Sequence, residues 1–263
     1  VATSGDTGKA AMEGFADVPQ TKILVFYPKD GVSKVQETQM VNQDGANVGV
    51  CAVVGNFDDA QAGVKRIFSD ESIRATLADR GYFLSSANSI NWGRLVPQIV
   101  YYFSAYCDLM TSGEMDYEGE KVNIVVPTGN FGNILAAYYA MKMGLPVNKL
   151  ICASNANNVL TDFLRTGIYD RNRPFHTTMS PSMDILVSSN LERLIYEISG
   201  RDDQKTRGKM EELKAAGHYA ISPEMREGLA DFQAGYATEE ETLAQIRRVY
   251  EKTGYLIEPH TAV

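Results

Sequence analysis

The sequence has 263 residues, with 25 Lys and Arg against 33 Asp and Glu, so its formal net charge at pH 7 is -8. With 44% hydrophobic and 22% charged residues, it has the composition of a globular protein rather than a disordered one. The acidic balance, with no block rich in Lys and Arg, argues against a nucleic-acid or membrane-surface partner. No apolar run approaches the roughly 20 residues that cross a bilayer.

The cysteine and histidine content predicts a metal-free protein of a reducing compartment. Cys51, Cys107 and Cys152 are widely spaced and lie in apolar segments, as expected for reduced core thiols of a cytoplasmic protein. The chain has no CxxC pair and only three histidines, so we expect no zinc site and no other metal.

Both ends of the sequence look cut. Residues 1–3 run from a strand-like start directly into a glycine-rich turn, without Met or a signal peptide. Residues 256–263 stop in the middle of a pattern. We therefore expect the sequence to be part of a longer protein.

Strand-like and helix-like stretches alternate along the chain. In chain order we expect a helix over 9–15, a strand over 22–27, a helix over 33–42, a strand over 47–54, helices over 58–68 and 71–80, a short strand over 82–86, a helix over 95–110, a strand over 122–126, a helix over 133–143, a strand over 150–154 and a helix over 159–166. Such alternation predicts an α/β fold with parallel sheets flanked by helices.

The last third of the sequence has a different character. Residues 190–253 are charge-rich with helical periodicity, and we expect no strand among them. The composition also breaks near residues 111–121. We therefore predict two lobes, a smaller one over 1–110 and part of a larger one over 111–263, which face one cleft.

A first polar loop, residues 3–9 (TSGDTGK), lies between a strand end and a helix. Its hydroxyls and backbone N–H groups at a helix start suit an anion such as a carboxylate. The spacing from Gly5 to Gly8 is too short for a P-loop, and a single Asp-Thr-Gly in an α/β chain is no aspartic-protease site. The alternative is a plain helix start capped by Ser4 or Asp6.

A second loop, residues 127–133 (PTGNFGN), follows a strand and opens a helix. Glycines allow close backbone approach, and the helix start supplies N–H groups, so a phosphate fits here. The pattern is not the dinucleotide fingerprint, because only one glycine interval matches. The alternative is a tight turn that binds nothing.

A third loop, residues 88–94 (NSINWGR), combines amides, a hydroxyl and a guanidinium at a helix entry. Arg94 can bind an oxyanion through two hydrogen bonds, and Trp92 is expected to pack. The alternative is a capped helix start with a solvated Arg94.

Thr261 and His260 follow the apolar residues 255–257. The Thr261 hydroxyl can hydrogen-bond a ligand nitrogen, and the alternative is an ordinary turn after a strand. Nothing separates His176 and His218 from surface histidines.

Taken together and in this order, these stretches resemble the threonine synthases, a branch of the fold-type-II pyridoxal-phosphate enzymes. The resemblance covers essentially the whole chain and is carried by residues 2–8, 86–91, 127–133, 180–185 and 259–263. It implies a fold similar to that of the tryptophan synthase β subunit, with pyridoxal phosphate as cofactor. The implied activity is a carbon–oxygen lyase that converts O-phospho-L-homoserine and water to L-threonine and phosphate, the last step of threonine biosynthesis, in a monomer or dimer.

The resemblance also implies a role for each loop. The cofactor would be bound at its phosphate by Gly129, Asn130, Phe131, Gly132 and Asn133, near its ring hydroxyl by Asp6 and at its pyridine nitrogen by Thr261. The substrate would be bound at its α-carboxylate by Ser4, Gly5 and Thr7, and at its phosphate by Asn88, Ser89 and Arg94.

One departure from the family pattern is large. The lysine that holds the cofactor as a Schiff base lies upstream of the first loop in this family, hence before Val1, and Lys9 matches no cofactor motif. We therefore expect no catalytic residue in this stretch, which alone should be inactive. Two alternatives stay open: another fold-type-II enzyme such as a serine/threonine dehydratase, which needs no site for a substrate phosphate, or a non-catalytic threonine-synthase-like binding protein.

Overall fold

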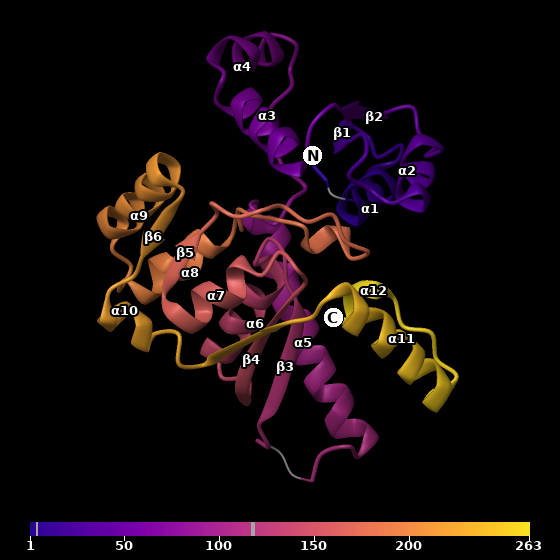
Figure 1. Ribbon diagram of the computed structural model, residues 1–263. Coiled ribbons are helices and arrows are strands. Elements are labelled where there is room, and N and C mark those ends of the chain that lie inside the picture. Colours follow the sequence, from indigo (N-terminus) through magenta and orange to yellow (C-terminus); the bar gives the residue numbers. More distant parts are fainter. Residues whose placement is uncertain (4, 117–118) are drawn as a thin grey trace. The chain divides into compact units, whose positions relative to one another are not determined.

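The computed structural model describes residues 1–3, 5–116 and 119–263 (Figure 1). The chain divides into two compact units, Val1–Asn91 and Trp92–Val263. The division thus precedes the helix α5 (Trp92–Ser112), whereas the composition break placed it after residue 110. The reason is packing, because α5 contacts α6 (Gly132–Lys142) of the second unit.

The first unit contains a two-stranded parallel sheet. Its strands are β1 (Ile23–Pro28) and β2 (Val48–Val53), and Ala2 forms a further parallel bridge to Phe26. Met12, Val25, Tyr27 and Met40 form its core. The helices of this unit, within the described residues, are α1 (Asp6–Phe15), α2 (Lys34–Val41), α3 (Phe57–Ser69) and α4 (Glu71–Ala78).

The strand expected over residues 82–86 is wrong. This segment pairs with no strand among the residues that the structure describes, and Phe83 is 90% exposed. The apolar residues of this segment were the basis for predicting a strand, but a strand needs a neighbouring strand as the partner for its backbone hydrogen bonds.

The second unit contains a three-stranded parallel sheet in the order β3-β4-β7. Its strands are β3 (Val122–Pro127), β4 (Val147–Ser154) and β7 (Phe232–Tyr236). The central strand β4 is the most buried of the three, with Leu150 and Cys152 fully enclosed. Helix α6 packs against β3 and β4 (Figure 1), and the first turn of α6 therefore lies near the carboxyl ends of the strands.

The remaining elements of the second unit follow or connect these strands. They are α7 (Val159–Thr166), β5 (Ile168–Asp170), the 3-10 helix η1 (Pro181–Met183), α8 (Leu191–Ile198), α9 (Asp203–Ala216), β6 (His218–Ala220), α10 (Pro223–Glu227), α11 (Glu239–Thr253) and α12 (Pro259–Ala262). Strands β5 and β6 pair antiparallel. The expectation of no strand over residues 190–253 is therefore wrong, since both β6 and β7 fall there.

The structure also bears on the cysteines and on membrane-spanning helices. Cys152 is buried, but Cys51 and Cys107 are exposed, so only one of the three thiols belongs to the core. Among the described residues, no helix combines the length and the apolar character that crossing a membrane requires.

Candidate functional site: three loops on two units

The loop between β3 and α6 is held in an unusual backbone conformation. Thr128 donates its N–H to the Ala153 carbonyl on the adjacent strand β4 at 2.8 Å. Phe131, the first residue outside α6, has φ 63°, in the left-handed region that side chains rarely adopt. Its ring is 1% exposed, with its centroid 5.9 Å from that of Phe232. Packing of this ring stabilises the turn.

Several backbone N–H groups of this loop donate to no acceptor within the described part of the chain. They belong to Gly129, Asn130, Phe131 and Asn133, whereas the Gly132 N–H donates to Asn130 Oδ1 at 2.9 Å. They lie at the N-terminus of an 11-residue helix, where the helix dipole favours negative charge. Phe131 is buried, Gly129 and Asn130 are partly exposed, and Asn133 is exposed. The loop thus fits the phosphate group that the sequence predicted here.

Two carbonyl groups of the same loop accept hydrogen bonds from residues of the following segment. Ser188 donates its hydroxyl to the Gly129 carbonyl at 2.8 Å, and Asn190 donates its N–H and Nδ2 to the Asn130 carbonyl at 3.0 and 3.1 Å. A Cβ atom on Gly129 would lie 2.5 Å from the Ser182 carbonyl oxygen. Only glycine therefore fits at this position, with the backbone of Ser182 directly behind it.

The predicted cofactor residue Asn133 is engaged by α5 through its side chain. Its Nδ2 donates to Gln98 Oε1 at 3.2 Å, and the Tyr102 hydroxyl donates to its Oδ1 at 2.6 Å. Burial raises the pKa of Tyr102, which keeps this hydroxyl a donor. What Asn133 offers a ligand here is its backbone N–H.

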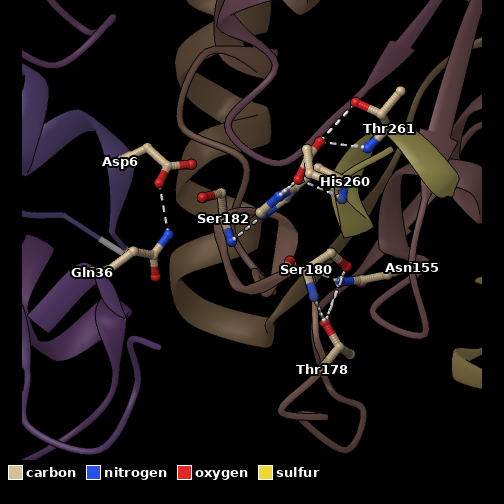
Figure 2. Close-up of polar contacts among 9 residues, drawn as sticks. Asp6, Gln36, Asn155, Thr178, Ser180, Ser182, His260 and Thr261 are labelled. Carbon is tan, nitrogen blue, oxygen red and sulfur yellow. Dashed lines mark hydrogen bonds and ion pairs between the residues drawn. The ribbon is translucent and has the colours of Figure 1, made fainter. Parts of the chain in front are cut away.

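Thr261 lies at the start of α12, where Glu258 caps the helix. Glu258 Oε1 accepts both the Thr261 N–H at 2.6 Å and its hydroxyl at 2.7 Å. A hydroxyl has one proton, so in this arrangement Thr261 Oγ1 can accept a hydrogen bond but cannot also donate one. The other Glu258 oxygen faces His260, whose Nε2 accepts the Ser182 N–H at 3.1 Å (Figure 2).

In the first unit, the loop before α1 is organised by Thr3. The Thr3 hydroxyl oxygen accepts the N–H groups of Gly5 and Gly8 at 3.0 and 2.9 Å. Helix α1 begins after Gly5, so Asp6 lies in its first turn and not at the N-cap position, and Ser4 lies outside the described residues. Asp6 Oδ1 instead accepts Gln36 Nε2 at 2.7 Å (Figure 2).

The residues predicted to bind the substrate phosphate fall on different units. Asn88 belongs to the first, where its Nδ2 donates to the Ala2 carbonyl at 2.9 Å. This contact places residue 88 beside the segment that carries Thr3, and Ser89 is buried next to it. Arg94 lies in the first turn of α5, in the second unit, and is half-buried. Convergence of these side chains on one anion stays a prediction.

A buried carboxylate organises the segment behind Gly129. Asp184 is 5% exposed and accepts four hydrogen bonds, from Asn155 Nδ2 at 2.7 Å, Asn157 Nδ2 at 3.0 Å, the Thr178 N–H at 2.9 Å and the Thr178 hydroxyl at 2.7 Å. Ser180 joins this network through Asn155 (Figure 2). Burial raises the pKa of Asp184, although the hydrogen bonds from Thr178 and Asn155 act in the opposite direction.

Five residues of these sites had no assigned role in the sequence-based predictions: Thr3, Gln36, Asp184, Glu258 and His260. Gln36 and His260 reach partners that are 30 and 78 residues away, and no local pattern marks such contacts. A partial local signal did exist for Glu258, because Pro259 is typical of the first position of a helix, and a carboxylate just before it can accept the N–H groups of the first turn.

Comparison with known proteins identifies the family. All 263 residues, 1–263, match the family described as pyridoxal-phosphate dependent enzyme. The human protein named threonine synthase-like 1 is 46% identical over 271 aligned residues, which cover 100% of this chain and 36% of that protein. Threonine synthase of Saccharomyces cerevisiae is 39% identical, with coverage of 100% and 52%. The chain therefore spans about half, or less, of the length of these relatives.

Solved structures agree with this assignment. The pyridoxal-phosphate-bound threonine synthase of Brucella melitensis superposes with a TM-score of 0.85 at 44% identity, covering 99% of this chain and 54% of that one. Yeast threonine synthase gives a TM-score of 0.84 at 37% identity, covering 99% and 52%. A threonine deaminase at 16% identity and a TM-score of 0.59 shares the fold alone. The fold is that of the fold-type-II enzymes.

Proposed function

The chain belongs to the family of pyridoxal-phosphate dependent enzymes, and from that premise we propose that the protein is a threonine synthase. The reaction is conversion of O-phospho-L-homoserine and water to L-threonine and phosphate. The observation that carries the proposal is the set of N–H groups after β3 that have no acceptor among the described residues, in a chain 44% identical to a pyridoxal-phosphate-bound threonine synthase.

We assign one anionic group of the cofactor or the substrate to each loop. Residues 129–133 hold the phosphate of the cofactor through backbone N–H groups. Ser4, Gly5 and Thr7 hold the substrate α-carboxylate, and Asn88, Ser89 and Arg94 hold the substrate phosphate. When bound, pyridoxal phosphate supplies an electron-accepting ring for carbanion chemistry.

Two further residues are assigned to the cofactor ring. Asp6 is assigned to the ring hydroxyl. The hydrogen bond from Gln36 Nε2 to Asp6 Oδ1, at 2.7 Å, would orient its carboxylate. Thr261 is assigned to the pyridine nitrogen. The Thr261 hydroxyl donates its proton to Glu258. In this arrangement its oxygen can accept a hydrogen bond from a protonated ring nitrogen. To donate to an unprotonated ring nitrogen, the hydroxyl would have to give up its hydrogen bond to Glu258.

The test is turnover by the intact protein saturated with pyridoxal phosphate. With O-phospho-L-homoserine, we expect L-threonine and inorganic phosphate in equal amounts, measured by amino-acid chromatography and a phosphate assay. With L-serine or L-threonine as substrate, we expect little keto acid. Rapid keto-acid formation without threonine synthesis would instead identify a dehydratase, and the proposal would be wrong.

A second candidate is a threonine-synthase-like protein without this activity. It is favoured by the higher identity to human threonine synthase-like 1, 46%, than to yeast threonine synthase, 39%. The same assay separates the two. Tight binding of pyridoxal phosphate and of O-phospho-L-homoserine, with no release of phosphate, would identify the second candidate.

A further inference from the structure

We infer that His260 is a positioning residue for the cofactor-phosphate loop, to which it is connected through the backbone of Ser182. The inference rests on the proposed role of residues 129–133. His260 Nε2 accepts the Ser182 N–H at 3.1 Å, and the Ser182 carbonyl lies 2.5 Å from where a Cβ on Gly129 would be. One residue therefore links the imidazole to the glycine of the loop.

Glu258 fixes the tautomer that this contact requires. A backbone N–H can donate only to a ring nitrogen that carries no proton. Glu258 Oε2 lies 2.7 Å from His260 Nδ1, and since a carboxylate is an acceptor, the ring proton belongs on Nδ1. Nε2 is then left as the acceptor for Ser182. The His260 side chain is 18% exposed, so water competes little for this contact.

The charge state of Glu258 supports the same arrangement. Burial acts to raise the pKa of Glu258, but hydrogen bonds from Thr261 and His260 outweigh it, so that the pKa is lowered. The carboxylate therefore remains an acceptor for His260 on one oxygen and for Thr261 on the other. One carboxylate thus orients both the residue assigned to the pyridine nitrogen and the one that supports the phosphate loop.

His260 is not placed to transfer protons itself. Both ring nitrogens have protein partners, Glu258 at Nδ1 and Ser182 at Nε2. Its effect on the cofactor is therefore geometric. In the described part of the chain, the loop carries N–H groups without an acceptor, which in the proposed role all bind one phosphate. Such donors are effective only when the surrounding structure holds them in place.

The experiment compares three variants of the intact protein. His260→Leu removes the acceptor, His260→Gln retains one near the position of Nε2, and His218→Leu changes a histidine that is exposed and contacts Ala216. The measurements are the dissociation constant for pyridoxal phosphate, from absorbance titration, and the ³¹P chemical shift of the bound cofactor.

We expect His260→Leu to weaken cofactor binding by about 10-fold, as for loss of one shielded hydrogen bond, and to move the ³¹P resonance. His260→Gln should stay within about 3-fold of the natural protein, and His218→Leu should match it. If His260→Leu does not fold, His260→Asn, whose shorter amide withdraws the acceptor, should give the same loss.

The inference is overturned if His260→Leu or His260→Asn lowers thermal stability but leaves the dissociation constant and the ³¹P shift of the folded protein unchanged. It is also overturned if His260→Gln loses as much affinity as His260→Leu. These readouts do not depend on turnover, so absence of threonine synthesis in the natural protein would refute the proposed function and leave this test intact.

Discussion

At the scale of single residues, Gly129 is the position where the structure tolerates least change. The space for a side chain is filled by the Ser182 carbonyl, 2.5 Å from the position of a Cβ atom. No flexible side chain can move aside, because the neighbouring atoms belong to the backbone. The sequence predicted the loop from its glycines, but not this neighbour, which comes from a segment more than 50 residues later.

We predict that Gly129→Ala weakens pyridoxal phosphate binding strongly and destabilises the protein by about 1–3 kcal/mol, the usual cost of overpacking. The matched control is Gly208→Ala in α9, where an added Cβ meets nothing within 4 Å. That change should stabilise the helix by about 0.5–1 kcal/mol. Equal cofactor affinity in both variants, by absorbance titration, would contradict the proposed role of the loop.

Replacement of Arg94 tests whether this residue binds the substrate phosphate or the cofactor. Removing a guanidinium–phosphate contact costs about 2–5 kcal/mol where the charge is desolvated. We therefore expect Arg94→Ala to retain bound pyridoxal phosphate and lose at least about 30-fold in kcat/KM for O-phospho-L-homoserine. Arg207→Ala, in the exposed helix face of α9, is the control and should keep both. If Arg94→Ala loses its cofactor while the bound fraction turns over normally, Arg94 belongs to the cofactor site.

At the scale of elements, periodicity predicted most helices and strands but not β7. Its sequence, Phe-Gln-Ala-Gly-Tyr, contains small and polar residues with little strand preference. The segment becomes a strand because β4 offers its second edge, from Leu150 opposite Phe232 to Ser154 opposite Tyr236. Pairing with a strand that is distant in the sequence makes this segment a strand, and the residues of β7 alone do not predict that pairing.

The segment around η1 is the clearest case of an element held by side chains. Between Thr178 and Asp184 only a three-residue 3-10 turn forms, and the Asp184 network takes the place of regular structure. The sequence pointed to residues 180–185 through a family resemblance, without a physical role. The structure supplies that role, since this segment supports Gly129 from behind.

We predict a pH signature for Asp184. Because burial raises its pKa, the folded state binds the proton more tightly than the unfolded state does. The contribution of this carboxyl to the free energy of unfolding is therefore fully present below the ordinary value of about 3.9, and it declines as pH rises through the raised pKa. Asp184→Asn lacks this titration, so the stability difference between the natural protein and the variant should shrink as pH rises.

Urea unfolding at several pH values above about 4 measures this difference. The control is Asp203→Asn, at a position whose side chain is 77% exposed, which should change the free energy of unfolding by no more than about 0.5 kcal/mol. A stability difference that grows with pH would mean that the four hydrogen bonds outweigh burial.

At the scale of the whole molecule, the sequence predicted two α/β parts and the order of three anion-suited loops. The loops are carried by separate units, with residues 3–9 and Asn88 on the first and residues 129–133, Arg94 and Thr261 on the second. The predicted boundary after residue 110 followed composition. The structural one follows packing, because α5 contacts α6 of the second unit. A single cleft lined by all three loops stays a prediction.

Residues 129–133 are proposed to hold the cofactor phosphate. A crystal structure of the intact protein with pyridoxal phosphate tests it most directly. We expect the phosphate oxygens within about 3 Å, ordinary hydrogen-bond distance, of the N–H groups of Gly129, Asn130, Phe131 and Asn133. The Ser182 N–H should still donate to His260. A phosphate bound instead at residues 3–9, with the N–H groups after β3 facing water, would refute the assignment of residues 129–133 to the cofactor.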